Sequence, residues 1–307
     1  QVRALTASQL NGLKEYQLQA IDDADIAAIS KSKLASMTAT QFAKLTTDQL
    51  VALTTVQAKG LTTTQLNALS GSQIAALETT DVAALTSTQV QNLTTTAIAG
   101  LTTAQVQSLN TAAVSVLTST QLANLGADDI AALSSSQIRA LSSTQLNALT
   151  STQLQAIETS DISAISTATL IAIDAAKLAN LTDAQLGALS PSQVKALTST
   201  QLNALSGSQI AVLETTDVAA LTSTQVQNLT TTAIAGLTTA QVQSLNTAAV
   251  SVLTSAQLAS LGADDIAALS SSQIRALSST QLNALTSTQL QAIETSDISA
   301  ISTATLI

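Results

Sequence analysis

Cysteine, histidine and tryptophan are absent from this chain of 307 residues. Without cysteine the chain can form neither a disulfide nor a thiolate nucleophile. The lack of histidine and cysteine also excludes Ser–His and Cys–His nucleophile systems and histidine-based metal sites. The nine glycines form no glycine-rich loop of the kind that binds phosphate. We therefore expect no enzyme activity and no catalytic, cofactor-binding or metal-binding residues.

Aromatic and charged residues are also scarce, at 1% and 9% of the chain. Roughly 25% charged residues is typical of a soluble domain, so threonine, serine, glutamine and asparagine supply most of the polarity here. The core must be built from leucine, isoleucine, valine and alanine. A net charge of −9 argues against a nucleic-acid partner, which requires clustered lysine and arginine. No apolar run is long enough to predict a membrane-spanning helix.

An eight-residue repeat organises the whole sequence. Leucine, isoleucine or methionine recurs at every eighth residue from Leu5 to Ile301 without interruption. We number each octad from that residue, so Leu45 is position 1 of the octad 45–52. Position 6 is also apolar, position 2 is usually threonine or serine, position 5 is usually glutamine or aspartate, and position 8 is mostly small, typically alanine. The repeat predicts a single continuous solenoid over residues 1–307.

A longer repeat lies on top of the octads. Residues 61–171 and 197–307 are near-identical copies, offset by 136 residues, which is a whole number of octads. A duplication of this length keeps the structural register. The copies differ at four places, which are Thr63/Ser199, Ala76/Val212, Thr120/Ala256 and Asn124/Ser260.

Neither a straight helix nor a flat strand accommodates an octad. At about 100° per residue, a continuous helix would rotate its apolar stripe by about 80° per repeat. In a strand, positions 1 and 6 would point to opposite faces because they differ in parity. A β-solenoid with bends remains an alternative, because threonine, valine and isoleucine favour strands.

A short capped helix explains every position of the octad. Threonine or serine at position 2 is a preferred N-cap, and glutamine at position 5 completes a capping box, in which the two residues bond each other's backbone N–H. Positions 1 and 6 then form the apolar pair that flanks a helix start. The only proline, Pro191, falls at the first helical position, where proline is favoured. We predict an all-α solenoid of one short helix per octad, with three or four octads per turn and helices beginning near residues 46, 54 and 62. Thr103, at an exposed first-turn position, is expected to tolerate aspartate.

Carboxylates gather in four short groups, which allow two interpretations. The first is calcium, which takes oxygen ligands. The second, which we favour, is that acids at positions 2 and 5 interact with the unpaired N–H groups and the dipole of helix starts. The groups are Asp22, Asp23 and Asp25; Glu78 and Asp81; Asp128 and Asp129; and Asp264 and Asp265.

Octads such as Leu101–Ser108, with the sequence Leu-Thr-Thr-Ala-Gln-Val-Gln-Ser, resemble repeat tracts of very large exported bacterial surface proteins. Those tracts are described as adhesin-like or as type I secretion substrates. The resemblance implies a secreted or cell-surface structural protein, a repeat-built rod that forms a filament, sheath or adhesin stalk by self-association. The expected partner is a longer array of the same repeats or further copies of the chain. The alternative is a module that binds carbohydrate, ice or another ordered surface through a Thr/Ser/Gln lattice, with surface glycans as its partner.

Overall fold

The computed structural model describes residues 2–299 and 301. Within them lie 37 short α-helices and one 3₁₀ helix, and no strand. This confirms the all-α solenoid of short helices and rejects the β-solenoid alternative. Leu306, the last apolar position-6 residue of the repeat, and the end of the second sequence copy lie outside the described residues.

The chain divides into two compact units, residues 1–157 and 158–307. Each is described by itself, and the single continuous solenoid stays a prediction. Unit 1 contains η1 (Val2–Ala4), α1 (Ala7–Gly12), α2 (Glu15–Gln19), α3 (Asp23–Ala27), α4 (Lys31–Ala35), α5 (Ala39–Phe42), α6 (Thr47–Val51), α7 (Thr55–Ala58), α8 (Thr63–Ala68), α9 (Gly71–Ala76), α10 (Thr79–Ala84), α11 (Ser87–Gln91), α12 (Thr95–Ala99), α13 (Thr103–Ser108), α14 (Thr111–Val114), α15 (Ser119–Ala123), α16 (Ala127–Ala131), α17 (Ser135–Ala140), α18 (Ser143–Ala148) and α19 (Ser151–Ala156).

Unit 2 contains α20 (Thr159–Ile162), α21 (Thr167–Ile171), α22 (Ala175–Leu178), α23 (Asp183–Gly187), α24 (Pro191–Ala196), α25 (Ser199–Ala204), α26 (Gly207–Ala211), α27 (Thr215–Ala219), α28 (Ser223–Gln227), α29 (Thr231–Ala235), α30 (Thr239–Ser244), α31 (Thr247–Val250), α32 (Ser255–Ala259), α33 (Ala263–Ala267), α34 (Ser271–Ala276), α35 (Ser279–Asn283), α36 (Ser287–Ala292) and α37 (Thr295–Ile298).

The capping box begins the helices, as predicted. Before α6, Thr46 is extended, with φ −70° and ψ 164°. Its hydroxyl accepts a hydrogen bond from the Gln49 backbone N–H at 3.2 Å, and the Gln49 side-chain oxygen accepts one from the Thr46 N–H at 3.1 Å. Thr54 and Thr62 cap α7 and α8 in the same way. The predicted helix starts near residues 46, 54 and 62 are therefore confirmed.

The chain turns between helices at the extended cap residue. Pro191 is the first residue of α24 after its cap Ser190, which confirms its predicted place. Within the part of the chain that the structure describes, no residue has a positive φ. The helices therefore end without the left-handed glycine that often terminates a helix, and the next N-cap makes the bend instead.

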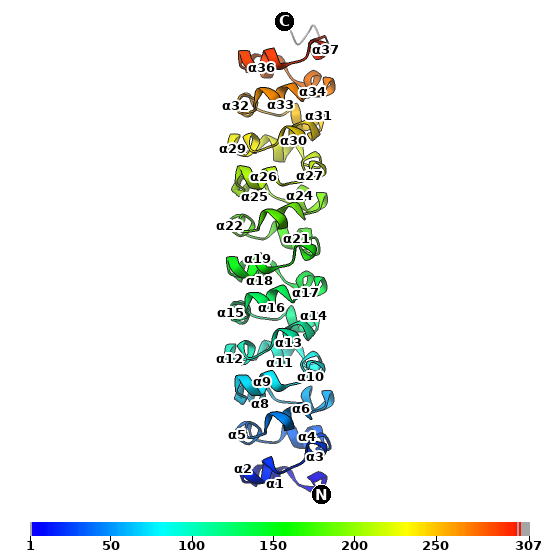
Figure 1. Cartoon of the computed structure of the whole chain (residues 1–307), viewed down its shortest axis with the longest axis vertical. Helices are drawn as coiled ribbons and strands as arrows, with labels where there is room; N and C mark the ends of the chain where they lie inside the picture. The colour runs from blue at the N-terminus through cyan, green and yellow to red at the C-terminus, as the bar shows by residue number, and fades with distance from the viewer. Residues whose placement is uncertain (1, 300, 302–307) are drawn as a thin grey trace. The chain divides into compact units, whose positions relative to one another are not determined.

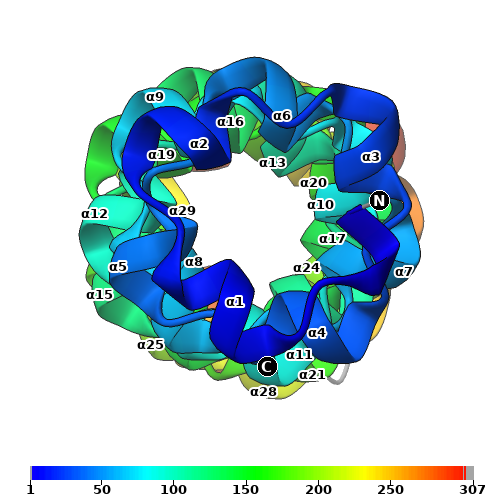
Figure 2. The same cartoon turned by 90° about the horizontal axis from the view of Figure 1, so that it is seen from below.

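Repetition of this bend winds each unit into a superhelix. In unit 1, α5 packs on α8, α10 on α13 and α16 on α19, and unit 2 repeats the pattern with α27 on α30. Figure 1 shows these stacked turns within each unit. In Figure 2, with the N-terminal end of unit 1 toward the viewer, the chain runs clockwise from N through α1, α2 and α3 as it recedes. The superhelix of unit 1 is therefore right-handed.

The core lies inside the superhelix and is made by positions 1 and 6. Leu45 and Leu50 are 2% and 0% exposed, and burying one such leucine contributes about 1.5–3 kcal/mol. Near each end of the described residues one of the two positions opens. In the first turn of unit 1 Leu13, at position 1, is half-buried while Leu18, at position 6, is fully buried. In the last turn of unit 2 Leu290, at position 6, is 43% exposed while Ile293, at position 1, stays buried. Each turn therefore completes its core only with its neighbour.

Candidate functional site

The position-5 glutamines connect each turn to the one before it. The Gln49 amide nitrogen, Nε2, donates to the carbonyl oxygens of Leu18 at 2.9 Å and Ile21 at 2.8 Å, which are 31 and 28 residues earlier. We call the repeated contact the glutamine ladder. It is formed in unit 1 by Gln41, Gln49, Gln57, Gln65, Gln73, Gln89, Gln105, Gln121, Gln137, Gln145 and Gln153. In unit 2 it is formed by Gln193, Gln201, Gln209, Gln225, Gln241, Gln257, Gln273, Gln281 and Gln289.

The sequence separations in the glutamine ladder indicate the number of residues in one turn of the superhelix. A spacing of 28 to 31 residues lies between three and four octads, as predicted. Each ladder glutamine except Gln41 works in two directions, because its Oε1 accepts the cap N–H of its own helix while its Nε2 donates to the preceding turn. At α5 the cap N–H of Thr38 donates instead to Asn11 Oδ1 at 2.8 Å. Gln105 is only 1% exposed, and a buried amide that lacks partners is costly. The ladder therefore meets the hydrogen-bonding needs of the amide inside the stack.

The sequence interpretation assigned these glutamines to capping alone and missed the contact between turns. A signal was present, because none of the position-5 residues is glutamate. A capping box accepts glutamate as well as glutamine, but only an amide can also donate to carbonyl oxygens. The preference for glutamine over glutamate at position 5 is explained by the ladder and not by the cap.

Octads with alanine at position 5 replace the ladder with asparagine. The octad of α12 has Ala97 there, and its cap N–H, from Thr94, donates instead to Asn67 Oδ1 at 2.8 Å, 27 residues earlier. Asn67 Nδ2 donates to Asn92 O at 2.9 Å. The α14 octad uses its cap, Asn110, whose Nδ2 donates to Ala83 O at 3.1 Å. These substitutes connect successive turns as the glutamines do.

Acids at position 5, such as Asp129, accept hydrogen bonds at helix starts, whereas Asp22 and Glu78 at position 2 make no side-chain cap hydrogen bond. Before α16 the cap is Gly126, whose N–H donates to Asp129 Oδ2 at 2.8 Å. Asp129 Oδ1 accepts a hydrogen bond from Thr103 Oγ1 at 2.8 Å, 26 residues earlier. Thr103 is exposed as predicted. Its tolerance of aspartate stays a prediction, and aspartate there would remove this donor and face Asp129. Among the described residues, no group of three or more potential ligands could hold a metal ion.

Asp81 and Asp217 differ from the other position-5 acids by being buried with one oxygen unbonded. Asp81 Oδ2 and Asp217 Oδ1 have no hydrogen-bond partner. Burial, followed by the charge of Glu78, raises the pKa of Asp81 to about 6. Burial is also the main reason that the pKa of Asp217 is raised to about 6. A hydrogen bond from the Glu214 backbone lowers this pKa, and the negative charge of Glu214 raises it.

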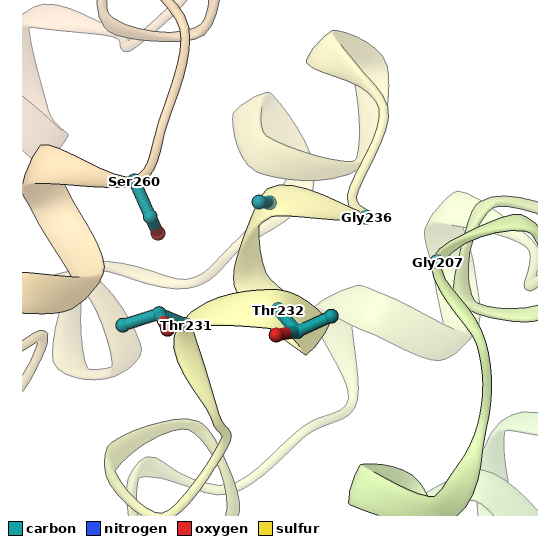
Figure 3. Close-up of a pocket in the computed structure, with 6 residues that line it drawn as sticks. Gly207, Thr231, Thr232, Gly236 and Ser260 are labelled. Carbon is teal, nitrogen blue, oxygen red and sulfur yellow. The ribbon is translucent and has the colours of Figure 1, made fainter.

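Two shallow hollows lie between successive turns on the outside of the units. The hollow in unit 2 has a volume of about 400 Å³ and is lined by Gly207, Thr231, Thr232, Ala235, Gly236 and Ser260. Figure 3 shows the threonine and serine hydroxyls around it. The hollow in unit 1 has a volume of about 430 Å³ and is lined by Lys59, Ala83, Ala84, Leu85, Thr86, Ser87 and Asn110. Neither brings together an acid and a base that could perform chemistry.

Comparison with known families agrees with the repeat. The family model of the ALTTAQ repeat matches residues 18–55, 74–111, 123–156, 178–215, 210–247 and 260–292. The chain belongs to the ALTTAQ repeat family. No curated protein matches the chain. Within the described residues of this ALTTAQ repeat protein, no helix is long and apolar enough to cross a membrane.

Proposed function

We propose that this ALTTAQ repeat protein is a non-enzymatic extracellular structural element, a filament subunit, sheath component or adhesin stalk of a large exported bacterial surface protein. Its role is to hold a repeating array together, with each turn bound by its neighbours. In repeat proteins of this kind, stability comes from the repeats and from their nearest-neighbour contacts.

The glutamine ladder is the observation that carries the proposal. Within each unit the ladder glutamines direct amide donors to the preceding turn and receive them from the following one, so the same contact can be repeated without limit. Gln9 and Gln17 belong to the ladder position but are exposed. A preceding turn, from the same array or from another copy, would cover their amides. The buried polar groups thus support assembly and leave no reactive set of side chains.

The alternative, a module that binds glycans or an ordered surface such as ice, must rely on threonine, serine and the exposed glutamines outside the ladder, such as Gln91, since most ladder glutamines are buried. In addition, a turn of 28 to 31 residues is not a whole number of octads. Equivalent hydroxyls in successive turns are therefore displaced around the superhelix, which disfavours a flat lattice of aligned rows.

Sedimentation velocity of the purified chain over a wide range of concentration tests the proposal. We expect concentration-dependent association, with ordered assemblies in negative-stain images. Gln9→Glu with Gln17→Glu should weaken association several-fold, because glutamate cannot donate to the carbonyls of a covering turn.

Gln91→Glu with Gln227→Glu is the matched control. It makes the same change at exposed glutamines outside the ladder and should leave association unchanged. A chain that stays monomeric throughout and binds immobilised glycans would favour the alternative function.

A further inference from the structure

Asp81 and Asp217 stand at position 5, where the ladder glutamines stand. As carboxylates they lack the donor hydrogens that the ladder contact requires. They are 1% and 0% exposed, so the side chains lie inside the stack. The ladder register, 28 and 31 residues back, places the carbonyls of Leu50 and Leu53 in the preceding turn opposite Asp81. A carboxylate only accepts hydrogen bonds, so an ionised Asp81 cannot donate a hydrogen bond to these carbonyl oxygens. The same holds for Asp217, opposite Leu186 and Leu189.

Other position-5 aspartates receive a hydroxyl from the preceding turn. The donor lies 26 residues earlier: Thr103 for Asp129, Thr239 for Asp265 and Ser271 for Asp297. At Asp217 the corresponding residue is Pro191, which has no hydroxyl. At Asp81 it is Thr55, yet Asp81 Oδ2 remains without a partner. These two aspartates therefore lack the contact that stabilises the ionised form elsewhere.

We propose that Asp81 and Asp217 are proton-dependent contacts between turns: each protonated carboxyl donates its O–H to a backbone carbonyl of the preceding turn, and each contact is lost on ionisation. The proton takes the place of the amide hydrogen that glutamine supplies. No other atom is transferred. Because the two positions are 136 residues apart, the duplication placed one such contact in each unit. The inference does not depend on the proposed extracellular role.

The surrounding charges favour the protonated form. Helix α10 packs on α7 and α13, and α27 packs on α24 and α30. Neither α13 nor α30 contains an ionisable side chain. Lys59 follows α7 and Lys195 lies in α24, while Glu78 and Glu214 cap the helices of the two aspartates. The charge that acts on Asp81 is that of Glu78.

The direction of the pH dependence follows from these environments. The pKa of each carboxyl is about 6 in the folded chain against 3.8 for the ordinary group. The folded state therefore binds more protons between these two values, and its stability falls as pH rises through the window. The contribution of the two contacts is fully present below about pH 4 and lost above about pH 6.

The test is urea unfolding followed by circular dichroism from about pH 4.5 to about pH 7.5. In the native sequence the unfolding constant should rise by at least about tenfold across this range. Asp81→Gln with Asp217→Gln should restore the ladder, remove most of this rise and stabilise the chain at neutral pH. Asp129→Gln with Asp265→Gln makes the same change at hydroxyl-bonded aspartates and should keep the rise.

A second readout follows the carboxyls directly by NMR of ¹³C-labelled aspartate. Two resonances should titrate near pH 6 and disappear in the double glutamine variant. Ordinary titration of both carboxyls, or an unchanged pH dependence in the double variant, overturns the proposal. So does stabilisation at neutral pH by sodium or calcium that the double variant abolishes, because the occupant would then be a cation.

Discussion

At the scale of the residue, the choice between an amide and a carboxylate at position 5 has the largest structural effect. Both groups can accept the cap N–H, so the cap alone would allow either. Inside the stack the other terminal atom of the position-5 side chain, Nε2 in glutamine, faces two backbone carbonyl oxygens of the preceding turn. An amide nitrogen has two hydrogens for those two acceptors, whereas a carboxylate would place negative charge beside them.

Gln105→Glu should therefore destabilise unit 1. Gln105 Nε2 donates to Ile74 O at 2.8 Å and to Leu77 O at 2.7 Å. Loss of both bonds with burial of a charge should cost about 2–4 kcal/mol at neutral pH. Urea unfolding measures the cost, and part of it should be recovered at low pH when the glutamate is protonated.

Gln107→Glu is the control for that change, because Gln107 is two residues away in the same helix and exposed. Its cost should stay within about 0.5 kcal/mol. Equal losses from the two variants would mean that the ladder contributes nothing beyond the general effect of added charge.

At the scale of the element, the distance between helices of successive turns depends on small residues. Gly100 and Gly236, both at position 8, end their helices with φ of −83° and −80°, so they are not needed for an unusual backbone conformation. They are needed for space: a Cβ added at Gly236 would lie 2.6 Å from Gly207 Cα. Small residues at position 8 therefore allow the close approach of helices at these pairs.

Gly236→Ala should accordingly separate α26 from the end of α29. The obstacle is backbone, which cannot rotate away, and overpacking of this kind costs about 1–3 kcal/mol. Gly12→Ala is a matched change at position 8, where an added Cβ meets nothing within 4 Å. It should be neutral or slightly stabilising, because alanine favours helix. Thermal unfolding of the two variants gives the comparison, and equal melting temperatures would contradict the packing argument.

The helices could be predicted from the sequence, because everything that defines them lies within one octad. The cap at Thr46, its partner Gln49 and the place of Pro191 depend on neighbours three residues away or fewer. The contacts between turns could not be predicted, because they join residues 25 to 31 positions apart and depend on the pitch. Thr103 shows the difference: its exposure was predicted, but its bond to Asp129 requires the next turn.

At the scale of the whole molecule, the ladder makes the octad the smallest unit that can be removed. Deletion of residues 45–52 brings each later glutamine opposite the carbonyls of an equivalent octad. The helical signal should persist, with only a small change in the urea midpoint. Deletion of residues 45–48 alone should abolish cooperative unfolding of unit 1, because the ladder and the core then fall out of register. Circular dichroism of the two deletions decides between these outcomes.

The Asn67–Thr94 pair sets a further condition on how such a gene can change in length. Its two members are 27 residues apart, so recombination that copies a single octad between them separates the cap from the asparagine that serves it. A recombining segment longer than this separation carries both members with it. The 136-residue copy does so: Asn203 and Thr230 reproduce the bond at 2.8 Å. Lengthening of the gene is therefore least disruptive in multiples of twenty-four nucleotides, and in segments that exceed one superhelical turn.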